Sequence, residues 1–119
     1  MGTYTLKDLP DEGTKFARVI TWVLTQADPV GQAIPIIEYQ DRTVQVEGTF
    51  GAGGTGFFKG SNDAVNFHTL RDPLGVFLIY SAPDVRQVLE ATAWVRPELT
   101  SGDGTTSLTV TLFMRKTRQ

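Results

Sequence analysis

A chain of 119 residues is long enough for one domain with a core that needs no disulfide or metal to hold it. Its 11 basic and 13 acidic residues leave a formal charge of −2, so it lacks the positive field that would gather nucleic acid or an anionic membrane. The absence of cysteine excludes disulfides and cysteine-ligated zinc. No apolar run approaches the ~20 residues of a membrane helix, and the N-terminus has no apolar signal-peptide segment.

Along the chain, β-forming runs alternate with turn-forming residues. Residues 1–15 are polar and turn-rich, so we expect an N-terminal arm or loop there, followed by one β-domain over 16–119. Within this domain, runs rich in β-branched and aromatic residues predict strands at 16–25, 34–39, 43–50, 55–60, 65–70, 76–81, 92–99 and 107–114. Pro35 has no N–H to donate, which places the second of these strands at a sheet edge.

The segment "APDVRQVLEA", residues 82–91, has a different period. Its apolar residues Val85, Val88 and Leu89 stand at i, i+3 and i+4, and Pro83 suits the first turn of a helix. We therefore expect one short helical segment near 83–90, crossing the end of the fold.

Seven or eight short strands separated by turns predict an all-β protein, an antiparallel β-sandwich of jelly-roll type. The clearest strand, "TVQVEGTF", puts Val44 and Val46 on its buried face. We expect the "GAGG" that follows to be a hairpin tip and residues 72–75 to form a β-turn. Asp103 and Gly104 favour a hairpin between the last two strands.

The residues that could carry chemistry do not form a catalytic pattern. A phosphate loop needs a helix after its glycines, whereas a strand follows the glycines of 51–54. His68 is the one histidine, and the chain has no Gly-x-Ser-x-Gly elbow and no evident carboxylate set beside it. The carboxylates stand mostly in turns or on polar strand faces. We expect a protein that is not an enzyme, with no catalytic residue, cofactor or metal.

The stretch "GSNDAVNFHTL", residues 60–70, resembles the Ser-x-Asp-Gly-x-x-Trp turn of discoidin-like and other carbohydrate-binding β-sandwiches. Ser61, Asp63 and Phe67 match that pattern, in which the aromatic residue enters the core. Ala64 departs from it, because it stands where glycine usually supplies a positive φ. The resemblance implies a turn with positive φ at residue 63 or 64.

A wider resemblance runs from about Asp41 to Met114. The series "DRTVQVEGTFGAGGT", "GSNDAVNFHTLRDPLG" and "RQVLEATAWVRPELTSGDGTTSLTVTL" resembles small virion-associated proteins encoded among the head genes of tailed bacteriophages. This resemblance implies a structural protein of the virion, assembled in the host cytoplasm. It also implies a decoration or cement role, with the major capsid protein or another virion protein as partner.

Strand alternation leaves several large apolar side chains on the outer sides of the predicted sheets. If Phe58, Leu78, Tyr80, Val95 and Leu112 point inward, the residues that point outward are Phe57, Phe77, Ile79, Trp94 and Phe113. So many large apolar side chains predict a protein interface, in a homo-oligomer or on a capsid. The alternative is that the arm or the 82–91 segment covers some of them. Tyr4, Leu6 and Leu9 of the arm have no core of their own and are further candidate interface residues.

The alternative function is a carbohydrate-binding module. Trp94 or Tyr80 would then be the platform for a sugar ring, and Asn62 or Asp63 would supply hydrogen bonds. Such a site needs its aromatic residues beside polar groups in a concave pocket, whereas an assembly surface needs them contiguous and flat.

Overall fold

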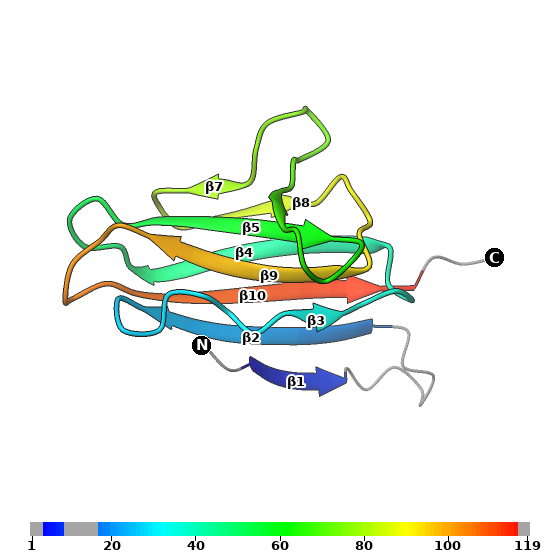
Figure 1. The fold of residues 1–119 in the computed structure, drawn as a ribbon, viewed down its shortest axis with the longest axis horizontal. Coiled ribbons are helices and arrows are strands. Elements are labelled where there is room, and N and C mark those ends of the chain that lie inside the picture. The colour runs from blue at the N-terminus through cyan, green and yellow to red at the C-terminus, as the bar shows by residue number, and fades with distance from the viewer. Residues whose placement is uncertain (1–3, 9–16, 117–119) are drawn as a thin grey trace.

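The computed structural model describes residues 4–8 and 17–116, and these form a sandwich of two antiparallel β-sheets (Figure 1). Sheet I has the strand order β1-β2-β10-β4-β8. Its strands are β1 (Tyr4–Asp8), β2 (Ala17–Thr25), β10 (Ser107–Arg115), β4 (Asp41–Thr49) and β8 (Asp84–Gln87). Sheet II has the order β3-β9-β5-β6, and β7 also pairs with β5. Its strands are β3 (Ile34–Pro35), β9 (Trp94–Thr100), β5 (Thr55–Ser61), β6 (His68–Thr69) and β7 (Ile79–Tyr80). The predicted all-β sandwich is confirmed.

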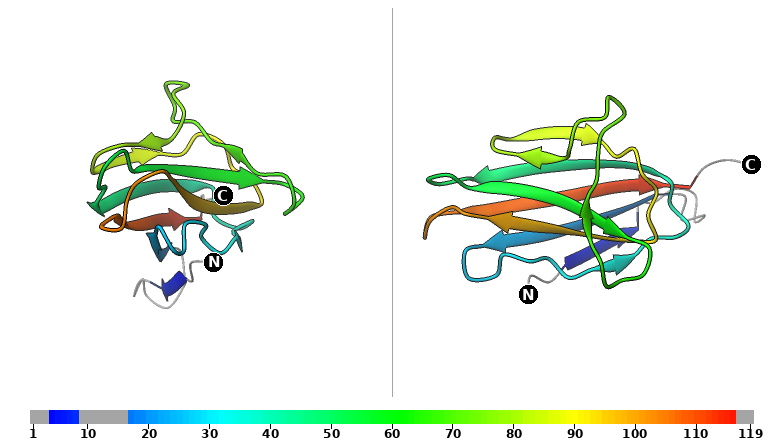
Figure 2. Two further views of the ribbon diagram at one scale, coloured as in Figure 1. Left: turned by 60° about the vertical axis from the view of Figure 1, so that its left-hand side comes forward. Right: turned by 45° about the horizontal axis from the view of Figure 1, so that its top comes forward.

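The chain passes repeatedly from one sheet to the other, after β2, β3, β4, β7, β8 and β9 (Figure 2). The "GAGG" segment joins β4 of sheet I to β5 of sheet II, and the Asp103-Gly104 loop joins β9 of sheet II to β10 of sheet I. Neither loop closes a hairpin, so both hairpin predictions are wrong. The strands that flank each loop belong to different sheets and do not pair with one another.

All eight predicted strands are present, although those expected at 34–39, 65–70 and 76–81 shrink to two residues each. Pro35 lies on the edge strand β3, as its missing N–H predicts. Residues 72–75 form the expected turn, in which Gly75 N–H donates to Asp72 O at 2.9 Å and Gly75 has a φ of 84°.

The predicted helix near 83–90 is wrong, because Asp84–Gln87 is strand β8, paired antiparallel with β4. Val88 is buried, but Val85 and Leu89 are 57% and 51% exposed, so the three apolar residues do not form one buried face. A helix of two turns is marginal by itself. Pairing with Thr43–Val46 instead satisfies the edge of β4, which would otherwise present free backbone groups.

The N-terminal segment also differs from the expected arm. Tyr4–Asp8 is strand β1, which pairs antiparallel with Arg18–Trp22 of β2 at the edge of sheet I. The expectation of an arm or loop is therefore wrong for these five residues. The apolar–polar alternation of "YTLK" is only four residues long and stands among polar, turn-forming neighbours, so it does not identify a strand. The pairing depends on β2 offering a free edge.

The core fills the space between the sheets. Trp22 of sheet I and Phe58 of sheet II meet edge to face with their ring centroids 6.3 Å apart, and both side chains are fully buried. Trp22 Nε1 donates to Gln32 O at 3.0 Å, which satisfies the indole N–H. The buried residues of β4 are Val44 and Val46, as the alternation predicts.

One positively charged side chain is also buried. Arg42 is 2% exposed, and its guanidinium donates to the carbonyls of Tyr39, Ile36 and Thr92 at 2.6, 3.1 and 2.8 Å. Burial lowers the pKa of Arg42 to about 10. This side chain ties the loop before β4 to the segment before β9, so it has a structural task that no sequence pattern indicated.

Candidate interaction surface

The structure brings four of the seven predicted interface residues to the outer side of sheet II and the loop beside it. Phe57 of β5 stands directly opposite Ile79 of β7. Trp94 of β9 lies on the same side, because the register pairs Phe57 with Glu98 and Ser61 with Trp94. Phe77 precedes Ile79 by two residues and forms a β-bridge with Arg71. We call Phe57, Phe77, Ile79 and Trp94 the apolar surface.

The inward and outward assignments made from alternation are confirmed. Phe58, Leu78 and Tyr80 are at most 2% exposed, whereas Phe77 and Ile79 are 53% and 41% exposed. Phe57 and Trp94 are half-buried. No helix covers this side of sheet II in the described residues. The segment that would cover it in the alternative, 82–91, contributes β8 to sheet I and the connection to β9.

Two of the other three predicted residues lie on a different sheet, and the third is not described. Tyr4 and Leu6 belong to β1, which is an edge strand of sheet I, and Leu9 lies outside the described residues. Phe113, 36% exposed, points outward as expected, but from sheet I.

Charged side chains lie between the two ends of the apolar surface. Glu98 of β9 pairs with Lys59 of β5 and with Arg96, each at 2.9 Å. Burial acts to raise the pKa of Glu98, but hydrogen bonds from Lys59 and Arg96 outweigh it and hold the pKa below its ordinary value. The guanidinium of Arg96 lies 4.0 Å from the centroid of the Phe67 ring, and Lys59 Nζ lies 5.8 Å from that of Phe57. Two cations of this face thus share one carboxylate within the face itself.

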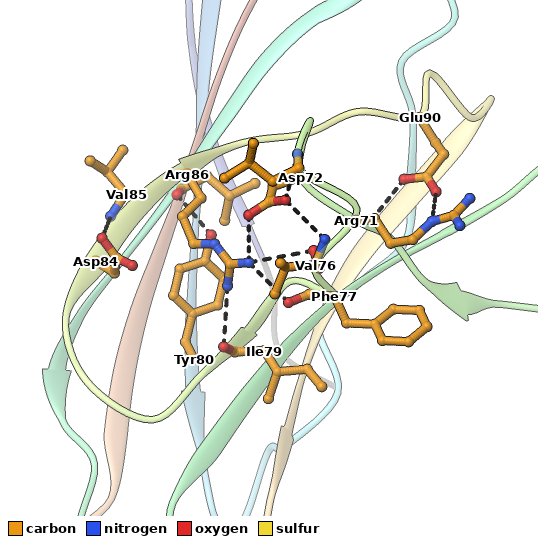
Figure 3. A network of polar contacts seen from close by, with 12 residues as sticks. Arg71, Asp72, Val76, Phe77, Ile79, Tyr80, Asp84, Val85, Arg86 and Glu90 are labelled. Atoms are coloured by element: carbon orange, nitrogen blue, oxygen red, sulfur yellow. Dashed lines mark hydrogen bonds and ion pairs between the residues drawn. The ribbon is translucent and has the colours of Figure 1, made fainter.

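The β6–β7 loop, residues 70–78, is held to the 84–90 segment by two neighbouring ion pairs (Figure 3). Arg71 pairs with Glu90 at 2.6 Å, and Asp72 pairs with Arg86 at 2.8 Å. Asp72 Oδ1 also accepts from the N–H groups of Leu74 and Val76, each at 3.0 Å. The hydrogen bond from Arg86, followed by those from the loop N–H groups, lowers the pKa of Asp72. Sequence reasoning identified Asp72 as a turn residue and missed its partner Arg86, which lies fourteen residues away on the other sheet.

The outer side of sheet I has a different composition. One row of directly paired residues crosses all five strands: Thr5, Thr21, Thr111, Gln45 and Val85. The three threonines are typical of a solvent-facing sheet, and the exposed apolar residues of this side include Val23, Val85 and Phe113. Aromatic residues and arginine are instead enriched in protein interfaces, and they gather on the outer side of sheet II.

The "SNDA" stretch is a turn between β5 and β6, as expected. Ser61 Oγ accepts from Ala64 N–H at 3.0 Å, and Asp63 Oδ1 accepts from Val65 and Asn66 N–H at 2.9 and 2.8 Å. Ala64 has a φ of 65°, which confirms the predicted positive φ. Phe67 does not enter the core that the discoidin-like pattern implies. It is half-buried under Arg96.

Of the four residues proposed for a sugar site, Trp94 is half-buried on the apolar surface, and the other three are engaged elsewhere. Tyr80 is 2% exposed, and its hydroxyl donates to Val44 O at 3.1 Å, so it offers no platform. Burial raises the pKa of this hydroxyl. Asn62 Oδ1 accepts from Ala93 N–H at 3.1 Å, and Asp63 caps the turn. His68 is exposed on β6. Within residues 4–8 and 17–116, no three metal-ligating side chains gather closely enough to hold an ion.

Comparisons with known proteins give little further information. No protein-family model matches the chain, and no curated protein sequence matches it. Among solved structures, the chain is similar to peruvianin-I, a cysteine peptidase from Thevetia peruviana latex, with a TM-score of 0.46 and 12% identity over 95% of this chain. The match covers 61% of the peptidase chain, and a likeness this weak carries no argument about function. No helix in the described residues has the length and apolar character needed to cross a membrane.

Proposed function

We propose that the protein is a non-catalytic structural protein of a phage virion, a decoration or cement protein that binds the assembled capsid. The observation that carries the proposal is the apolar surface, where Phe77 and Ile79 are about half exposed beside Phe57. Large apolar side chains grouped on one face are typical of a protein-binding site. The resemblance to virion-associated proteins supplies the class of partner.

The arrangement suits binding more than chemistry. The aromatic residues lie along the outer side of a sheet, and Lys59 and Arg96 among them both pair with Glu98, so the face offers contact area with these charges already engaged. At about 25 cal/mol per Å², burying two phenylalanines contributes several kcal/mol to an interface. Symmetric arrays add to such contacts, because each capsid presents many copies of one site. A homo-oligomer of the protein on the capsid is part of this proposal.

The test is co-sedimentation of the purified protein with tailed-phage capsids that lack it, after its mass in solution has been measured. We expect Phe57→Thr with Phe77→Thr to reduce the amount that sediments. The matched control is Phe113→Thr, the same change at an outward phenylalanine of sheet I. Equal binding by the double variant and the wild-type protein would mean that the apolar surface is not the capsid-binding site. Failure of the wild-type protein to bind would contradict the capsid role.

A further inference from the structure

The β6–β7 loop points its apolar side chains away from the core. Leu74, Val76 and Phe77 are 88%, 54% and 53% exposed, and Leu78 at the end of the loop is fully buried. The three exposed side chains therefore contribute little packing that could fix the course of the backbone. The shape of the loop must depend on its hydrogen bonds.

Four hydrogen bonds come from one guanidinium and reach the loop and the first residue of β7 (Figure 3). Arg86 Nη2 donates to Asp72 Oδ2 at 2.8 Å, to Phe77 O at 3.1 Å and to Val76 O at 3.4 Å. Arg86 Nη1 donates to Ile79 O at 3.4 Å. One acceptor is the carboxylate of Asp72, in the turn of the loop. The other three are the backbone carbonyls of Val76, Phe77 and Ile79, whose side chains are exposed.

The position of Arg86 is fixed from the other sheet. It lies on β8, opposite Val44 of β4, and its guanidinium is 5.5 Å from the centroid of the Tyr80 ring. Its side chain is 17% exposed, and that of Asp72 is 13% exposed, so the pair is largely shielded from water. This arrangement differs from an exposed ion pair, which contributes little. A planar guanidinium can serve several acceptors at once, and a lysine ammonium cannot reproduce that geometry.

We propose that Arg86 is a positioning residue for partner binding: it holds the β6–β7 loop in the one shape that presents Val76, Phe77 and Ile79 together. The inference rests on the proposed function only in that the apolar surface is where the partner binds. A loop that is already ordered gives up less conformational entropy on binding, so its affinity is higher.

The test compares Arg86→Gln and Arg86→Lys with a matched control, Arg115→Gln. Arg115 also pairs with an aspartate, Asp41 at 3.0 Å, but this exposed pair is on sheet I. Two quantities are measured at a temperature where melting curves show every variant folded. The first is amide hydrogen exchange at Val76, whose N–H donates to Asp72, and at Leu78, whose N–H donates to Leu70 O. The second is the affinity for tailed-phage capsids.

Both Arg86 variants should exchange faster at Val76 and bind capsids about tenfold more weakly, as expected if the competent loop shape falls to about a tenth of the population. Arg115→Gln should change neither quantity. In the Arg86→Gln background, Phe77→Thr should reduce binding less than it does in the wild-type protein, because the two changes affect one element.

Two results would overturn the proposal. Unchanged exchange at Val76 in both Arg86 variants would mean that the guanidinium does not hold the loop. Faster exchange with unchanged capsid affinity would mean that the loop shape does not matter to the partner. If the wild-type protein does not bind capsids at all, the proposed function and the partner role of Arg86 are both wrong, while the exchange comparison still decides whether Arg86 orders the loop.

Discussion

Two residues other than glycine have a positive φ in the described chain, Ala64 at 65° and Ser101 at 68°. A side chain with a Cβ is strained in this region by about 1–2 kcal/mol, and glycine is not. In the Ser61–Asn66 turn, the strain is offset by the bonds that Ser61 and Asp63 accept from the backbone. The sequence located this turn because Ser, Asn and Asp form such bonds within a few residues.

Ala64→Gly should raise the free energy of unfolding by up to about 1 kcal/mol, because relief of the left-handed strain exceeds the extra chain entropy of glycine. Urea denaturation measures the change. Ser101→Gly, the other positive-φ site, is the matched comparison and should change in the same direction. A clear loss of stability in Ala64→Gly would show that the turn in solution has an ordinary backbone at this residue.

Asp103 joins the two loops at one end of the sandwich. Its carboxylate accepts from Thr105 Oγ1 at 2.6 Å and Thr105 N–H at 2.9 Å within its own loop, and from Ala52 N–H at 3.1 Å in the "GAGG" segment. These bonds, that of the Thr105 hydroxyl first, lower the pKa of Asp103 from 3.8 to about 2. A carboxylate in this position stabilises the folded state only while it is ionised.

The sign of the resulting pH dependence follows from the lowered pKa. The contribution of Asp103 is fully present above pH 4, near its ordinary pKa, and is lost as the pH falls through about 2. Asp103→Asn should therefore lower stability at pH 7 and make the loss of stability between pH 4 and pH 2 shallower. Thermal melting across this range measures both effects. Parallel curves for the variant and the wild-type protein would contradict the assignment.

At the scale of whole elements, the sequence predicted which segments are strands better than it predicted their partners. Alternation identified Phe58, Leu78 and Tyr80 as inward, because period-two patterning depends only on local geometry. The hairpin predicted at Asp103-Gly104 was wrong, because turn chemistry does not reveal whether the next strand joins the same sheet. Arg86 was missed for a similar reason, since its acceptors are brought to it only by the packing of β8 beside the β6–β7 loop.

The edge strand β1 gives a test at this scale. Deleting residues 1–8 should leave a folded domain, because the opposite edge of β2 still pairs with β10 along its whole length. Stability should fall and aggregation should rise, since the deletion exposes the backbone groups of Arg18–Trp22 as a free edge. Thermal melting and light scattering measure the two effects. An unchanged melting temperature would mean that β1 adds nothing to sheet I in solution.

At the scale of the whole molecule, substitutions of the inward and outward phenylalanines should distinguish residues needed for folding from residues needed for association. Phe58→Ala should cost about 3–5 kcal/mol of stability, because it empties the contact with Trp22 at the centre of the sandwich. Phe77→Thr should cost less than about 1 kcal/mol, because the side chain is half exposed. Urea denaturation of both variants tests this. A large loss in Phe77→Thr would mean that the β6–β7 loop is part of the core.

The strand order of sheet I has a consequence for synthesis on the ribosome. β10, the last of the described strands to be made, is the central strand of that sheet and lies between β2 and β4. Until it emerges, β2 and β4 cannot be joined, and sheet II has only half of a core to pack against. The nascent chain therefore exposes the apolar faces of Trp22 and Val44 until residue 115 has emerged from the ribosome, and a chain that stops before Ser107 leaves sheet I split in two.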